Sequence, residues 1–87
     1  MKAQFCKEVL EFLKSEYSDA YEFNINLYED QFRWQAELKI KSGNFTRIIS
    51  NCYMKYFYNL YLQDTSIIQE RNQFKWQKEL IDLIEGS

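Results

Sequence analysis

The chain has 87 residues, of which 46% are hydrophobic and 28% charged, so it suits one small folded domain and is too apolar to stay disordered. It has no His, no Pro and only two Gly, which excludes histidine catalysis, histidine metal sites and glycine-rich phosphate loops. The net charge is −2, but residues 32–63 hold five basic side chains and one acidic one, whereas both flanking segments are acidic. The middle of the chain is therefore a basic segment between acidic flanks.

Residues 3–17 have the apolar spacing of a helix with one buried side. Its stripe consists of Phe5, Val9, Phe12, Leu13 and Tyr17, with charged residues between them. The following Ser18-Asp19 pair is a plausible end for this helix.

Two strands are predicted next. Residues 21–28 alternate between apolar and polar side chains, and residues 29–31 form a polar turn. The alternation is strongest over residues 32–41, where Phe32, Trp34, Ala36, Leu38 and Ile40 form the inward-facing side.

A turn at Ser42-Gly43-Asn44 and a third strand over residues 45–50 complete an antiparallel meander. Two registers fit this turn. A three-residue loop places Lys39 opposite Arg47, both on the exposed face, whereas a two-residue Gly43-Asn44 loop turns Arg47 toward the core. The sequence leaves both registers open.

Residues 51–63 fit two structures. Read as a helix, the segment has a polar residue at every fourth position, which forms a polar stripe. Read as a strand, with a period of two, it has one apolar face. The tyrosine content favours the strand. The length of the segment and its lack of turn residues favour the helix, which we expect here. A break at Asp64-Thr65-Ser66 precedes a last helix within residues 66–85, ended by Gly86.

The expected fold is therefore α+β: one domain over residues 1–87, with an N-terminal helix, a three-stranded antiparallel meander, and one or two C-terminal helices packed on one sheet face. This order of elements resembles the double-stranded RNA-binding domain, in topology only. That family's basic start of the last helix would fall at residues 66–75, where Arg71 and Lys75 are the basic residues and Glu70 opposes them. The resemblance therefore does not make the chain a member.

No set of residues predicts catalysis, a metal or a cofactor. Cys6 and Cys52 lie in apolar runs and are expected to be small buried side chains rather than nucleophiles. The carboxylate pairs Glu8 with Glu11 and Asp82 with Glu85 lie on the wet sides of helices. We therefore expect a protein that is not an enzyme.

Three groups of side chains are candidates for binding. The basic sheet face holds Arg33, Lys39, Lys41 and Arg47; the acidic helix face holds Glu8, Glu11, Glu16, Asp19 and Glu22; the interface aromatics are Tyr53, Tyr56, Tyr58 and Tyr61. An acidic face can imitate nucleic-acid phosphates on a basic target, and Tyr anchors are common at protein interfaces.

The expected function is stoichiometric binding to a protein target, such as a nucleic-acid enzyme, by a small inhibitor, immunity or phage anti-defence type of protein. The alternatives are a nucleic-acid-binding module that uses the basic face and a homo-oligomer, for instance a dimer, joined through residues 53–61. Two cysteines without a secretory signal and without an apolar membrane span predict a cytoplasmic protein. The Lys, Asn, Ile, Tyr and Phe content suits a low-GC bacterium or its phage.

Overall fold

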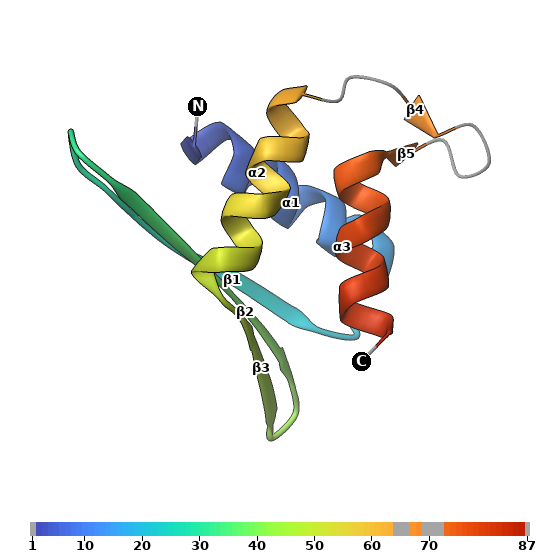
Figure 1. The fold of residues 1–87 in the computed structure, drawn as a ribbon. Helices are drawn as coiled ribbons and strands as arrows, with labels where there is room; N and C mark the ends of the chain where they lie inside the picture. The colour runs from blue at the N-terminus through green and yellow to red at the C-terminus, as the bar shows by residue number, and fades with distance from the viewer. Residues whose placement is uncertain (1, 64–66, 69–72, 87) are drawn as a thin grey trace. The chain divides into compact units, whose positions relative to one another are not determined.

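A computed structural model describes residues 2–63, 67–68 and 73–86 (Figure 1). The elements in chain order are α1 (Lys2–Tyr17), β1 (Glu22–Glu29), β2 (Trp34–Ser42), β3 (Phe45–Ile49), α2 (Asn51–Gln63), β4 (Ile67–Ile68), β5 (Gln73–Phe74) and α3 (Lys75–Glu85). The N-terminal helix, the three-stranded meander and two C-terminal helices confirm the predicted α+β class. The chain divides into two compact units, Met1–Lys55 and Tyr56–Ser87.

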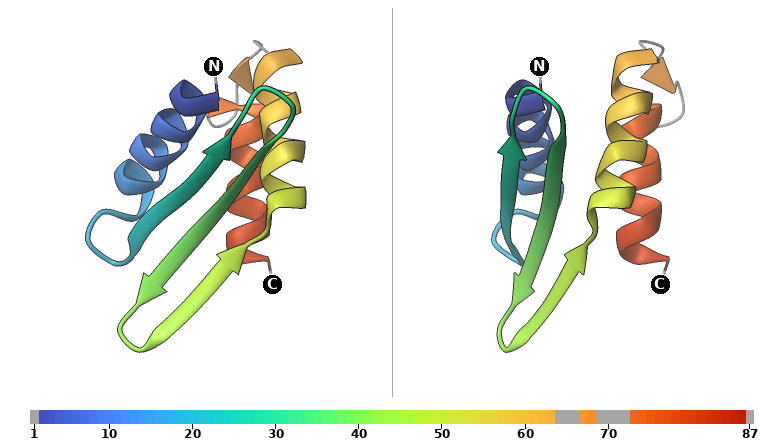
Figure 2. Two further views of the ribbon diagram at one scale, coloured as in Figure 1. Left: turned by 90° about the vertical axis from the view of Figure 1, so that its left-hand side faces the viewer. Right: turned by 60° about the vertical axis from the view of Figure 1, so that its left-hand side comes forward.

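Helix α1 forms where the apolar spacing predicted it. Phe5, Val9 and Leu13 are fully buried, and the helix packs beside β1 (Figure 2). The helix ends at the predicted position because Ser18 adopts a left-handed φ of 50°, and its N–H donates to the Lys14 carbonyl at 2.9 Å. This single bond satisfies one of the carbonyls that a helix end leaves open.

The first unit holds the antiparallel sheet, with strand order β1-β2-β3 (Figure 2). Opposite residues share a face, so the pairs Phe23–Ile40 and Ile25–Leu38 define one face, which we call the inner face. Five inner-face residues are buried: Phe23, Ala36, Leu38, Ile40 and Ile49. The other face, the outer face, carries exposed side chains throughout. Burial with period two is what makes the alternating sequence a strand.

In the meander, the structure corrects one prediction and resolves one alternative that the sequence left open. Strand β2 begins at Trp34, and Phe32 lies in the preceding turn with 86% of its surface exposed, so its predicted inward position is wrong. The β2–β3 turn has two residues, because Ser42 pairs with Phe45 and Ile40 pairs with Arg47. Gly43 has a φ of 60°, which suits the first central position of a type II′ hairpin turn.

The second segment with an ambiguous pattern, residues 51–63, is helix α2, which confirms the helical interpretation. Its buried residues Met54, Phe57 and Tyr58 follow helical spacing. Helix α3 buries Trp76, Leu80 and Ile81 and ends before Gly86, as predicted.

The sequence did not predict the short β4–β5 ladder, in which Ile67 pairs with Phe74. The break predicted at residues 64–66 lies outside the described residues. Among those that are described, no helix combines the length and the apolarity that crossing a membrane requires.

Candidate functional site

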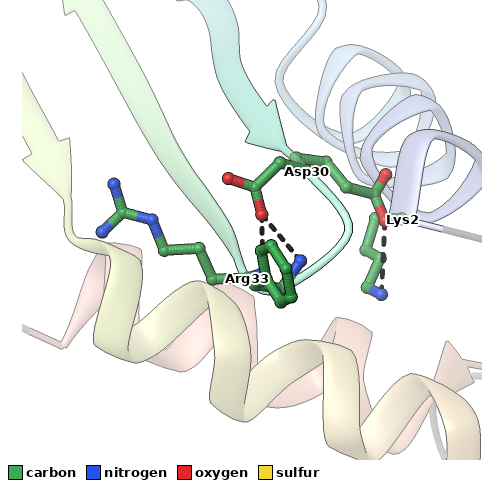
Figure 3. Close-up of polar contacts among 5 residues, drawn as sticks. Lys2, Asp30 and Arg33 are labelled. Carbon is green, nitrogen blue, oxygen red and sulfur yellow. Dashed lines mark hydrogen bonds and ion pairs between the residues drawn. The ribbon is translucent and has the colours of Figure 1, made fainter.

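The turn between β1 and β2 is built around the carboxylate of Asp30. Its Oδ1 accepts hydrogen bonds from the backbone N–H groups of Phe32 and Arg33, at 2.8 and 2.9 Å (Figure 3). Its Oδ2 accepts a hydrogen bond from the Tyr28 hydroxyl at 2.9 Å, and the Asp30 N–H donates to the Arg33 carbonyl. Short side chains such as Asp favour this local bonding to the backbone two and three residues ahead. One side chain thus fixes the conformation of the whole turn.

The same hydrogen bonds set the charge state of Asp30. Three donors point at the carboxylate, the two backbone N–H groups first and the Tyr28 hydroxyl after them, and they lower the pKa of Asp30 from its ordinary 3.8. Asp30 is therefore ionised at neutral pH, and the turn that it organises is intact there.

Phe32 sits at the end of this turn and is the most exposed of the large apolar side chains described, at 86%. Beside it, the Arg33 guanidinium lies over the Tyr28 ring at 5.7 Å from the centroid, a cation–π contact. Tyr28 is itself 51% exposed. We call residues 28–34 the β1–β2 tip. It presents a Phe, a Tyr and an Arg together on a fixed backbone.

On the inner face of the sheet, the tip carries a second aromatic ring, Trp34, which contacts two lysines. The ammonium groups of Lys2 and Lys55 lie 5.9 and 5.6 Å from its centroid. Lys2 also forms an ion pair with Glu29 at 3.3 Å, which ties the start of α1 to the end of β1 (Figure 3). The start of α2, one turn before Lys55, is attached to the sheet because the Ala36 N–H donates to Asn51 Oδ1 at 3.0 Å.

The predicted basic face is only partly assembled. Lys39 and Lys41 project from the outer face of β2, and Arg33 lies on the same side of the hairpin, over Tyr28. Arg47 does not join them, because the two-residue turn places it opposite Ile40 on the inner face, where it is half-buried. Lys41 faces Glu22 across the strand pair. The outer face is therefore mixed in charge.

The predicted acidic face is also interrupted by cations. Glu11, Glu16, Asp19 and Glu22 are exposed and Glu8 is half-buried. A cleft of about 550 Å³ brings Asp19 and Glu22 together with Lys39 and Lys41 from the predicted basic face, and Lys14 from α1 lines it as well. Two members of each predicted charged group thus line one cleft together, so the cleft is mixed in charge.

The four predicted interface tyrosines differ in exposure. Tyr53 and Tyr56 are about half exposed, whereas Tyr58 is buried and Tyr61 is half-buried. Tyr61 stacks on Tyr58 and meets Trp76 edge-on, with centroids 6.0 Å apart, so these two rings belong to the packing of the second unit. The Tyr56 hydroxyl donates to Glu79 at 2.6 Å, and this bond raises the pKa of Tyr56.

The cysteines also differ. Cys6 is buried as predicted, and desolvation raises the pKa of its thiol, with a smaller effect from the charge of Glu29. The prediction of a buried Cys52 is wrong. It precedes the buried Met54 by two positions and so lies on the other side of α2, where it is exposed. Within residues 2–63, 67–68 and 73–86, Cys, Asp and Glu form no group of three that could hold a metal ion.

Sequence reasoning missed the exposure of Phe32 at the β1–β2 tip because the alternation of apolar residues continues unbroken through Phe32. The available signal was Asp30, whose position two residues before Phe32 and three before Arg33 is typical of a side chain that bonds to a turn. Comparison with protein-family models, with curated proteins and with solved structures finds no match to this chain.

Proposed function

We propose that this chain acts by stoichiometric binding to a protein target and that the β1–β2 tip anchors the complex. The observation that carries the proposal is the position of Phe32, which is held 86% exposed on a turn fixed by three hydrogen bonds to one carboxylate. An exposed Phe gains nothing from water. It gains free energy when a partner covers it.

Binding energetics support this use of the tip. A buried aromatic ring removes on the order of 150–250 Å² from water, and Tyr and Arg are enriched among the residues that dominate interface energies. The turn is already ordered, so little conformational entropy is lost when the tip docks. Phe32, Arg33 and Tyr28 therefore combine the residue types and the preorganisation that a binding hot spot requires.

The type of protein that fits the proposal is an inhibitor or immunity protein, which acts by occupying a site on its target. A cytoplasmic setting, in which both thiols stay reduced, belongs to the same proposal, as does an origin in a low-GC bacterium or its phage. The buried, protonated Cys6 thiol supports binding over nucleophilic chemistry, since the thiolate is the reactive form. Within this proposal, the acidic helix face is a second contact region.

The nucleic-acid alternative receives less support. Arg47 lies on the inner face, and Lys41 faces Glu22, so the expected row of four cations is reduced. Binding to phosphates depends on several such contacts made at once.

The proposal is tested by capture from an extract of the source cells, with matched variants of two exposed phenylalanines. Phe32→Ala should weaken the captured complex about 30-fold, the effect of losing a hot spot of about 2 kcal/mol. Phe45→Ala removes the same ring from the β2–β3 turn, where it is 70% exposed, and should leave the affinity unchanged. Mass spectrometry identifies the partner, and the solution mass of the complex gives the stoichiometry. Capture of no protein, or equal affinity for both variants, contradicts the proposal.

A further inference from the structure

Around the β1–β2 tip, the acidic side chains and two of the basic side chains have different kinds of partner. The Asp30 carboxylate accepts three hydrogen bonds from the turn itself, and the Glu29 carboxylate pairs with Lys2. The Arg33 guanidinium and the Lys55 ammonium lie instead over aromatic rings. Within the part of the chain that the structure describes, neither of these two cations forms an ion pair. The donors to Asp30 are neutral groups, so its carboxylate keeps its charge, and the tip together with Lys2 and Lys55 holds three cations and two carboxylates, an excess of one positive charge.

These two cations lie on opposite sides of the hairpin ribbon. Tyr28, under Arg33, belongs to the outer face of the sheet, because it pairs with Gln35. Trp34, near Lys55, shares the parity of the inner-face residues Ala36 and Leu38. Phe32 lies in the turn that joins the two strands. The arrangement is thus an apolar ring at the end of the hairpin, with a cation on either side.

We propose that the β1–β2 tip recognises an acidic segment of its partner protein, in which apolar residues cover Phe32 while Asp or Glu side chains meet Arg33 and Lys55. This inference rests on the proposed function and assigns the partner's chemistry. Cations on ring faces are partly desolvated already, and a guanidinium binds a carboxylate through two parallel hydrogen bonds. The working surface is therefore basic and apolar, the reverse of the acidic face that the sequence suggested.

A protein segment fits this surface better than a nucleic acid does. Single-stranded nucleic acids also stack on aromatic rings, but they bring one phosphate per nucleotide and need a continuous basic groove. Here the excess around the tip is only one positive charge, and the whole chain carries a net charge of −2, which is too little for a strand of phosphates. Two cations around one apolar ring match a short acidic and apolar peptide.

The test is an NMR titration of the isotope-labelled full chain with three defined probes. The first is a peptide with a Leu-Phe centre flanked by Asp and Glu, the second is the same peptide flanked by Lys, and the third is a short oligo(dT) strand. The acidic peptide should shift the amides of residues 28–34 saturably and bind roughly tenfold more tightly than the basic peptide.

Matched double variants separate local charge from net charge. Arg33→Glu with Lys55→Glu should reverse the preference, so that the basic peptide binds more tightly. Lys39→Glu with Lys41→Glu makes the same change of net charge at the other end of the sheet and should keep the wild-type preference. Replacing Arg33 and Lys55 by Gln should abolish the preference without reversing it, and circular dichroism checks that each variant is folded.

Equal binding of the two peptides, shifts that map away from both residues 28–34 and Lys55, or tighter binding of oligo(dT) at the tip would overturn the inference. These results leave the capture experiment untouched, since a Phe32-dependent complex could still form with a partner of other chemistry. Conversely, a tip that prefers the acidic peptide in a chain that captures no protein would contradict the proposed function alone.

Discussion

The two turns of the sheet place a phenylalanine in water by different physical means. In the β1–β2 turn, the Asp30 side chain bonds to the backbone N–H groups of Phe32 and Arg33, and Phe32 is 86% exposed. In the β2–β3 turn, the backbone freedom of Gly43 provides the geometry, and Phe45 is 70% exposed. One turn is held by side-chain hydrogen bonds and the other by a residue without a side chain.

Under the proposed function, the β2–β3 turn serves only to connect two strands, whereas the β1–β2 turn carries the binding surface. Gly43 adopts its positive φ without the steric strain of a Cβ, and a Cβ at that position would meet no neighbouring atom within 4 Å. The β1–β2 turn instead gathers Tyr28, Arg33 and Phe32 around one carboxylate. We infer that the second arrangement is the one suited to binding, because it fixes side chains as well as backbone.

Among the changes that test the comparison of the two turns, the largest effect is expected for Asp30→Ala on binding. The variant loses the three hydrogen bonds to the carboxylate, so the tip must be ordered when it docks, and the affinity for the captured partner should fall about threefold to tenfold. The change is measured as a dissociation constant, with amide hydrogen exchange of Phe32 and Arg33 as the local readout. Unchanged affinity together with faster exchange would show that preorganisation of the turn does not matter.

Gly43→Ala should lower the stability of the fold and leave binding unchanged. Its φ of 60° is unfavourable for a residue with a Cβ, so the free energy of unfolding should fall by about 1 kcal/mol, which urea denaturation measures. Partner affinity should stay at the wild-type value because this turn is not part of the tip. A loss of affinity as large as that of Asp30→Ala would remove the distinction between the two turns.

The smallest effect is expected from pH. Because the pKa of Asp30 is lower in the folded chain than its ordinary 3.8, its ionised form stabilises the fold above that pH, and this contribution is lost as the pH falls through the folded value. Urea midpoints of the wild type and Asp30→Asn should therefore differ at neutral pH, and the difference should shrink as the pH falls below 3.8. A difference that is constant over this range would assign the stabilisation to hydrogen bonding without charge.

Much of the fold could be predicted because burial repeats with the period of each element. The stripe of Phe5, Val9 and Leu13 indicated α1, and the alternation of Ala36, Leu38 and Ile40 indicated β2. Residues 51–63 were harder, since their apolar residues fit two periods, and the spacing of Met54, Phe57 and Tyr58 in the structure shows that the helical one applies.

The candidate site was less predictable because its position depends on where the strand ends, and the alternating sequence pattern continues beyond that point. Phe32 continues the alternation of Trp34 and Ala36, so periodicity alone placed it inside, whereas the hydrogen bonds of Asp30 end the ladder before it. Arg47 shows the same limit. Its face depended on whether the turn held two or three residues, and that choice reverses every side chain of the strand.

Composition and periodicity alone thus determined the α+β class, the order of elements and most of the buried residues, because burying apolar surface imposes a repeat that is visible along the chain. Tertiary structure alone decided the hairpin register, the exposure of Phe32 and Cys52, and the grouping of Arg33 and Lys55 around the tip. Those features arise from single hydrogen bonds and from contacts between residues far apart in sequence, which leave no repeat to read.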